Sequence, residues 1–133
     1  MMTRLFTVLV AMLFAGQLHG QSDDPIYTTT IPAYGMHVQA TEEVPMEWLY
    51  LSAIGFEHMT DVENEYRLRE TLAKNGFRIL LIGEDRPFTD LPEFANDPEV
   101  ADAGGLGGNP GEPFIGVRSI NPHILVHELA HGI

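Results

Sequence analysis

The strongest constraint on how this chain folds is an H-E-x-x-H pattern near its end, at residues 127–131. Residues four apart share one face of an α-helix, so His127 and His131 can hold a single metal ion if this segment is helical. Asn121 is a good N-cap and Pro122 suits the first helical position, and an apolar run follows them. The pattern therefore predicts a capped helix that carries a metal site on one face.

Two imidazoles beside a carboxylate form the arrangement that zinc-dependent hydrolysis requires. His127 and His131 are the expected ligands of Zn²⁺, and Glu128 is the expected base that activates water. The alternative is an amphipathic helix that carries histidines on its solvated face. His123 has the same spacing, but it lies about 12 Å along the axis from His131, so we do not expect it to be a ligand.

The position of the pattern leads to a further expectation. A catalytic zinc site has three protein ligands and a water molecule, and in such enzymes the third ligand normally follows the second histidine. Only Gly132 and Ile133 follow here. We therefore expect the N-terminal part of a zinc hydrolase, inactive and weakly zinc-binding by itself. We also expect the helix to fray after about His127 and the elements that pack over Leu129 to be absent.

The N-terminus is typical of a secretory signal. Arg4 precedes an apolar run and then small residues, so we expect a signal peptide at 1–20 and a single domain at 21–133. The run is too short to span a bilayer as a mature helix, which predicts no stable membrane insertion after cleavage; the alternative is an uncleaved N-terminal anchor. The chain has no cysteine, so disulfides and lipidation are excluded. These features indicate a secreted, periplasmic or cell-envelope protein.

The composition is strongly acidic, with 7 basic and 19 acidic residues and a formal net charge of −12. This balance argues against nucleic acid and against anionic membrane surfaces as partners. Apolar periodicity and turn residues predict strands near 28–31, 36–40, 77–82 and 114–117, and helices from Pro45 and at 62–74. We expect Asp61 to cap the second of these helices, Asn75-Gly76 to end it, and the glycine-rich residues 104–108 to be a flexible connection.

Four segments carry a resemblance. They are LAKNGFR at 72–78, TDLPEF at 89–94, GLGG at 105–108 and ILVHELAH at 124–131. The last is similar to the active-site helix of zincin metallopeptidases, and the wider pattern resembles uncharacterised secreted bacterial zincin-like proteins. The resemblance implies an α+β fold with a small twisted sheet, backing helices, and the metal helix along the floor of a cleft. It also implies a strand beside the cleft that can bind an extended peptide.

Two functional hypotheses follow. The first is a secreted zinc metallopeptidase that acts on a peptide or protein substrate, with Glu128 as its base; the choice of peptide hydrolysis comes from the resemblance. The second is a secreted metal- or partner-binding module with the same fold and no turnover. The intact Glu128 favours the first, because a purely structural site has no chemical need for a carboxylate beside its first ligand.

Overall fold

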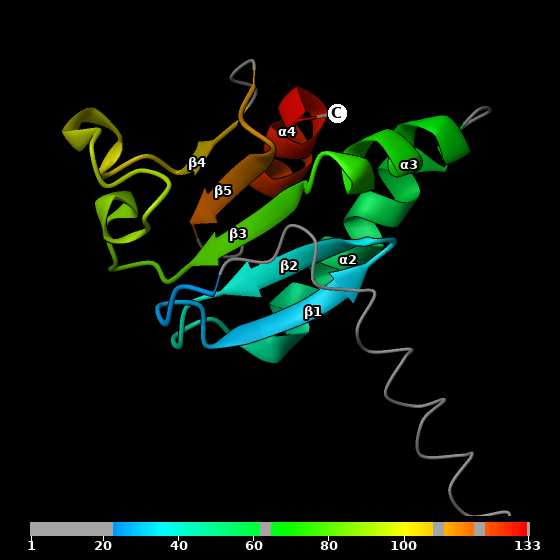
Figure 1. The fold of residues 1–133 in the computed structure, drawn as a ribbon. Helices are drawn as coiled ribbons and strands as arrows, with labels where there is room; N and C mark the ends of the chain where they lie inside the picture. Colours follow the sequence, from blue (N-terminus) through cyan, green and yellow to red (C-terminus); the bar gives the residue numbers. More distant parts are fainter. Residues whose placement is uncertain (1–22, 62–64, 108–110, 119–121, 133) are drawn as a thin grey trace, which may run out of the picture.

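The computed structural model describes residues 23–61, 65–107, 111–118 and 122–132. The expected signal peptide and the N-cap Asn121 lie outside these residues. The elements run in the order β1(Thr29–Ala33), β2(Met36–Ala40), α2(Met46–Thr60), α3(Glu65–Lys74), β3(Arg78–Ile82), η1(Phe88–Asp90), η2(Pro98–Val100), β4(Gly105–Leu106), β5(Phe114–Arg118) and α4(Pro122–Gly132) (Figure 1). The expected α+β class is confirmed.

The strands form one mixed sheet in the order β1-β2-β3-β5-β4 (Figure 1). The three central strands are parallel to one another, whereas each edge strand is antiparallel to its neighbour. Pro32 is tolerated in β1 because an edge strand leaves one side of its backbone unpaired within the sheet. The short edge strand β4 is formed by the glycine-rich residues that were expected to be a flexible connection, so that expectation is wrong.

The helices lie behind one face of the sheet (Figure 1). Their core contains Leu49 and Phe56 of α2 and Leu125 and Leu129 of α4, packed against inward-pointing strand residues such as Val117. Leu129 has no exposed surface, so the expectation that its packing partners are missing is wrong. The described residues bury it, because Leu129 belongs to the core that α2, α4 and the central strands form together.

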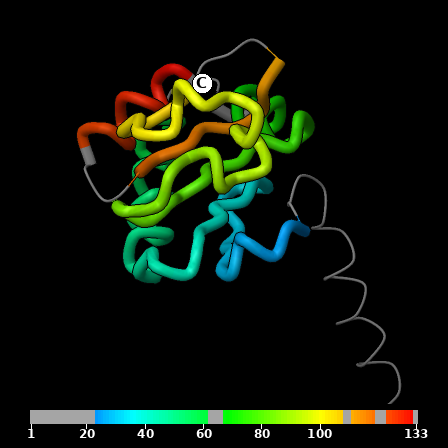
Figure 2. Tube along the Cα trace, turned by 90° about the vertical axis from the view of Figure 1, so that its left-hand side faces the viewer, coloured from blue at the N-terminus to red at the C-terminus, as the bar shows by residue number. Residues whose placement is uncertain are grey.

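The opposite face of the sheet is covered by the segment 83–103, which lies in the foreground of Figure 2. Phe88, Leu91 and Phe94 of this segment pack on Leu80 and Ile82. Its backbone is held by Arg118, whose guanidinium donates hydrogen bonds to four main-chain carbonyls, those of Ala101, Ala103, Glu84 and Arg86. A long segment with little regular structure is therefore tied to the sheet at both its ends.

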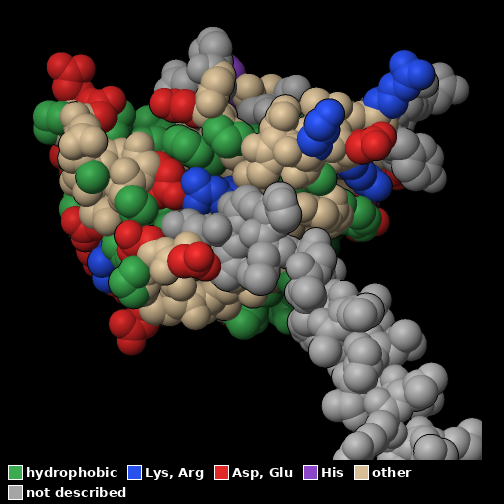
Figure 3. Space-filling model, in the orientation of Figure 1, with side chains coloured by type: hydrophobic (Ala, Val, Ile, Leu, Met, Phe, Trp, Pro, Cys, Tyr) green, Lys and Arg blue, Asp and Glu red, His purple; other side chains and the backbone are tan. Residues whose placement is uncertain are grey.

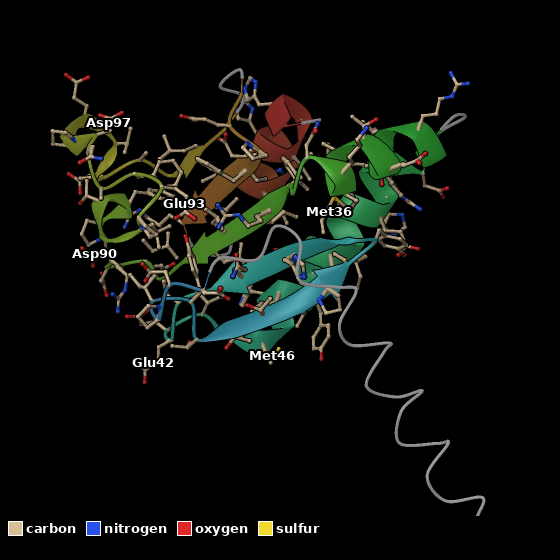
Figure 4. All side chains as sticks on the ribbon, in the orientation of Figure 1. Met36, Glu42, Met46, Asp90, Glu93 and Asp97 are labelled. Atoms are coloured by element: carbon tan, nitrogen blue, oxygen red, sulfur yellow. The ribbon has the colours of Figure 1, made fainter. Side chains whose placement is uncertain are left out.

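A buried polar cluster also holds the segment 83–103 on that face of the sheet. Glu93 reaches over β3 (Figure 4), where it accepts a hydrogen bond from Arg78 at 2.6 Å and another from the Tyr27 hydroxyl. Burial, together with the hydrogen bond to Glu93, raises the pKa of Tyr27 above its ordinary value. The cluster joins the beginning of the described chain to the segment 83–103.

Helix ends follow the local sequence in most places. Pro45 is the N-cap of α2, and Pro122 begins α4. Gly76 has a φ of +69°, and the amides of Gly76 and Phe77 bond back to Ala73 and Leu72, as in a Schellman ending. Asp61 is the C-cap of α2, whereas its expected role as an N-cap concerns residues 62–64, outside the described part.

Two other features of the described residues concern their surroundings. None of their helices is long and apolar enough to cross a membrane. Acidic side chains crowd the end of the molecule that the segment 83–103 forms, and several basic side chains lie over α3 at the other end (Figure 3). The net negative charge is therefore distributed unevenly.

Candidate functional site

Helix α4 holds the H-E-x-x-H residues in a fixed orientation because one of its faces is locked into the core. Leu125 and Leu129, four residues apart, are 8% and 0% exposed. They approach α2 at Gly55, where an added Cβ would lie 3.6 Å from Leu125 and 4.0 Å from Leu129. These are ordinary van der Waals separations, so the two leucines pack closely on α2 at this point, and their burial sets the rotation of α4.

With that rotation, His127 and His131 point outward. Both are exposed, and their Nε2 atoms lie 3.1 Å apart. The rings are nearly perpendicular, with an interplanar angle of 81° and centroids 4.6 Å apart. Two neutral imidazoles at this separation can share one hydrogen bond, or both nitrogens can face a common third atom. The sequence therefore predicted correctly that α4 brings these two residues together.

The side chain of Glu128 has a different environment, between α4 and the edge strand β4. The residue is only 8% exposed. A Cβ added at Gly105 would lie 2.6 Å from Cγ and 2.7 Å from Oε1 of Glu128, and one added at Gly107 would lie 3.4 Å from Oε2. The absence of a side chain at Gly105 makes room for Glu128, which lies directly against the backbone of β4, whereas Gly107 mainly makes room for Ile115.

The histidine pair fits one half of a zinc site. Ring nitrogens that share a tetrahedral zinc ion lie roughly 3.3 Å apart, given Zn–N distances of about 2.0–2.1 Å. The observed 3.1 Å between the Nε2 atoms is close to this separation without any movement of the helix. The donor types also suit the metal, because imidazole is a common zinc ligand. His127 and His131 can therefore act as two of the ligands.

A complete ligand set is not assembled by the described residues. Within 23–61, 65–107, 111–118 and 122–132, no group of three or more histidine, aspartate or glutamate side chains is placed to hold a metal ion. His37 lies in β2 and His58 near the end of α2, apart from the pair in the sequence and on other elements. His123 is exposed in the first turn of α4.

The sequence did not reveal the role of the glycines in β4. They were interpreted as loop residues, yet Gly105 and Gly107 adjoin both the carboxylate of Glu128 and the edge of the sheet. The closely spaced glycines were themselves the signal in the sequence, because glycine inside a strand often marks the close approach of another group. Only the sheet register shows which group that is.

Comparison with known proteins places no constraint on this site. No protein family model matches the chain, and no significant match was found among curated proteins or among solved structures.

Proposed function

We propose that this protein is a zinc-dependent peptidase of the cell envelope or of the extracellular space. The observation that carries the proposal is the geometry of α4: two exposed histidine nitrogens 3.1 Å apart, and a shielded carboxylate on the next residue after the first histidine. This combination supports hydrolysis because a carboxylate on the residue after the first metal-binding histidine can act as a general base, for which a structural metal site has no need.

The chain's own residues have distinct tasks in this proposal. His127 and His131 bind the ion, and a third ligand comes from outside the described residues. Bound zinc supplies Lewis acidity and lowers the pKa of water toward neutrality. Glu128 accepts the proton of the attacking water and then gives it to the leaving amine. The contact of Glu128 with β4 limits its rotamers, so the carboxylate is oriented before substrate binds.

The edge strand supports a peptide as substrate. β4 pairs with β5 on one side only, through Gly105↔Val117 and Leu106↔Gly116. An extended peptide added along the other side of β4 would form main-chain hydrogen bonds with it, as in β-augmentation. Its backbone would then run beside the strand that contacts Glu128. Peptide hydrolysis is thus the zinc chemistry that this arrangement favours.

A second candidate is a metal- or partner-binding module without turnover. It is favoured by the incomplete ligand set in the described part of the chain and by the low exposure of Glu128, 8%. Such a module would bind zinc through the same histidines but would not need the carboxylate. The two candidates therefore differ in what happens when Glu128 is changed.

The deciding experiment measures zinc content and peptidase activity in matched variants. In the zinc-loaded full-length protein, Glu128→Gln should keep the zinc and lose at least about 100-fold of the activity, because it removes a general base. His127→Gln and His131→Gln should each lose the zinc. His123→Gln is the control, since it changes a histidine on the same helix outside the pair.

Different outcomes reject different parts of the proposal. Full activity in zinc-loaded Glu128→Gln would exclude Glu128 as the base. Stoichiometric zinc without hydrolysis of any peptide, in the unchanged protein, would favour the binding module. Equal zinc content in the His127 and His123 variants would reject the metal site itself.

A further inference from the structure

Helices α2 and α4 leave a cavity of about 530 Å³ between them, and Gly55 is part of its lining. Trp48 and Leu51 of α2 form one wall, and Leu125 and Val126 of α4 form the other. Leu81 and Val117, near the ends of β3 and β5, close its inner side. A volume of this size is within the range of pockets that hold one small organic ligand, roughly 300–1,000 Å³.

The pocket continues onto an exposed apolar surface. Leu51 and Val126 are each 49% exposed although they also line the cavity. Ile54 of the same helix is also 47% exposed. Large apolar side chains left in contact with water around a cavity are typical of a binding site.

Acidic residues lie at the mouth of this pocket. Glu43, Glu84 and Asp85 line it and are exposed, and among the described residues that line it none is basic. The nearby Arg86 forms an ion pair with Glu43, and this hydrogen-bonded pair lowers the pKa of Glu43 to about 2. Glu43 therefore stays ionised but its charge is offset by Arg86, so Glu84 and Asp85 supply the net negative charge beside the apolar interior.

We propose that this pocket binds a small apolar organic cation, in which an aliphatic or aromatic body carries an ammonium group. The body would fill the space between Trp48 and Val126, and the ammonium group would lie among the carboxylates at the mouth. A neutral ligand would gain only the burial of its apolar surface, and an anion would be repelled. This site is separate from the histidine pair and does not depend on zinc.

The chain contains its own reporter for the test, because Trp48 is the only tryptophan. The 133-residue protein, treated with a chelator, is titrated with octylammonium, octanol and octanoate, three probes that share one alkyl chain. Octylammonium should change Trp48 fluorescence with saturation and bind roughly fivefold to tenfold more tightly than octanol. Octanoate should bind more weakly than either.

Two pairs of variants locate the effect. The double change Glu84→Gln and Asp85→Asn should remove most of the preference for octylammonium and leave octanol binding unchanged. The control Glu47→Gln changes an acidic residue of α2 that lies outside the pocket lining, and it should have little effect. Leu51→Lys should abolish octylammonium binding, and Tyr50→Lys, a neighbouring exposed position outside the lining, should not.

The proposal is overturned by any of three results: no saturable Trp48 response to octylammonium, equal affinity for octanol and octylammonium, or equal effects of Leu51→Lys and Tyr50→Lys. Because the protein is zinc-free in this test, its outcome is independent of whether the histidine pair supports hydrolysis. Circular dichroism verifies that each variant is folded.

Discussion

Gly105→Ala is the change that most directly tests the contact between β4 and Glu128. The added Cβ would lie 2.6 Å from Cγ of Glu128 and 2.8 Å from Cγ2 of Ile124. Carbon atoms pack best at about 3.5–4.0 Å, so each neighbour must move by roughly 1 Å. Such overpacking costs about 1–3 kcal/mol, and the loss of glycine's freedom in the unfolded chain offsets up to about 1 kcal/mol. We expect a net destabilisation of about 1–2 kcal/mol.

The neighbouring glycine offers a matched control. A Cβ added at Gly104 would meet only Cδ1 of Ile124, at 3.3 Å, the flexible end of a side chain. Urea unfolding, followed by Trp48 fluorescence, measures both variants. We expect Gly104→Ala to change the free energy of unfolding by less than about 0.5 kcal/mol. In a hydrolytically active form, Gly105→Ala should also lower activity on the order of 100-fold, because a base displaced by about 1 Å is misaligned.

A double-mutant cycle shows whether the contact with Glu128 causes the destabilisation by Gly105→Ala. Glu128→Ala removes Cγ and the carboxylate, so the part of the cost of Gly105→Ala that comes from Glu128 should disappear in that background, and the contact with Cγ2 of Ile124 should account for the remainder. An equal cost in both backgrounds, or an equal cost for Gly104→Ala and Gly105→Ala, would refute the close packing of Glu128 on β4.

Three further predictions concern stability and metal binding. Arg118→Met should destabilise the fold by about 3 kcal/mol in urea unfolding, because four main-chain carbonyls of the covering segment lose a charged donor; a change below about 1 kcal/mol would contradict this role. Glu93→Gln should cost about 3 kcal/mol by leaving the largely buried Arg78 without its carboxylate, measured against the exposed control Glu99→Gln. The 133-residue chain should bind zinc more weakly than about 1 µM in a titration, because the part of it that the structure describes supplies only two imidazoles; tighter binding would place the third ligand within this chain.

One prediction concerns pH. The hydrogen bond from Arg86 lowers the pKa of Glu43 to about 2, below its ordinary value of 4.5. The stabilisation from this pair is therefore present above about pH 4.5 and is lost as the pH falls toward 2. Because Glu43 is largely exposed, the effect should be less than about 1 kcal/mol. Glu43→Gln should flatten the acid limb of the stability curve by that amount, and an unchanged limb would contradict it.

Local patterns in the sequence predicted the elements that depend on local interactions. The ending of α3 at Asn75-Gly76 follows from the left-handed backbone that Gly76 adopts, with a φ of +69°. β3 was recognisable as a run of apolar residues, and it is buried between two layers. The pairing of His127 with His131 also required only the helical period, so it was predictable before any tertiary contact was known.

Tertiary packing determined what local patterns could not. Leu51 and Ile54 have large apolar side chains of the kind that usually lies in a core. They are nevertheless exposed, because α2 directs Leu49 and Phe56 toward the sheet instead. Gly105 looks like a loop residue in the sequence, but it pairs with Val117 in the sheet and lies directly against Glu128 of α4. Periodicity records which residues share a face of one element, whereas the neighbour that this face meets depends on how distant segments pack. The helical period alone thus predicted the histidine pair. Only the fold placed β4 against Glu128 and formed the pocket beside Trp48 that acidic residues line.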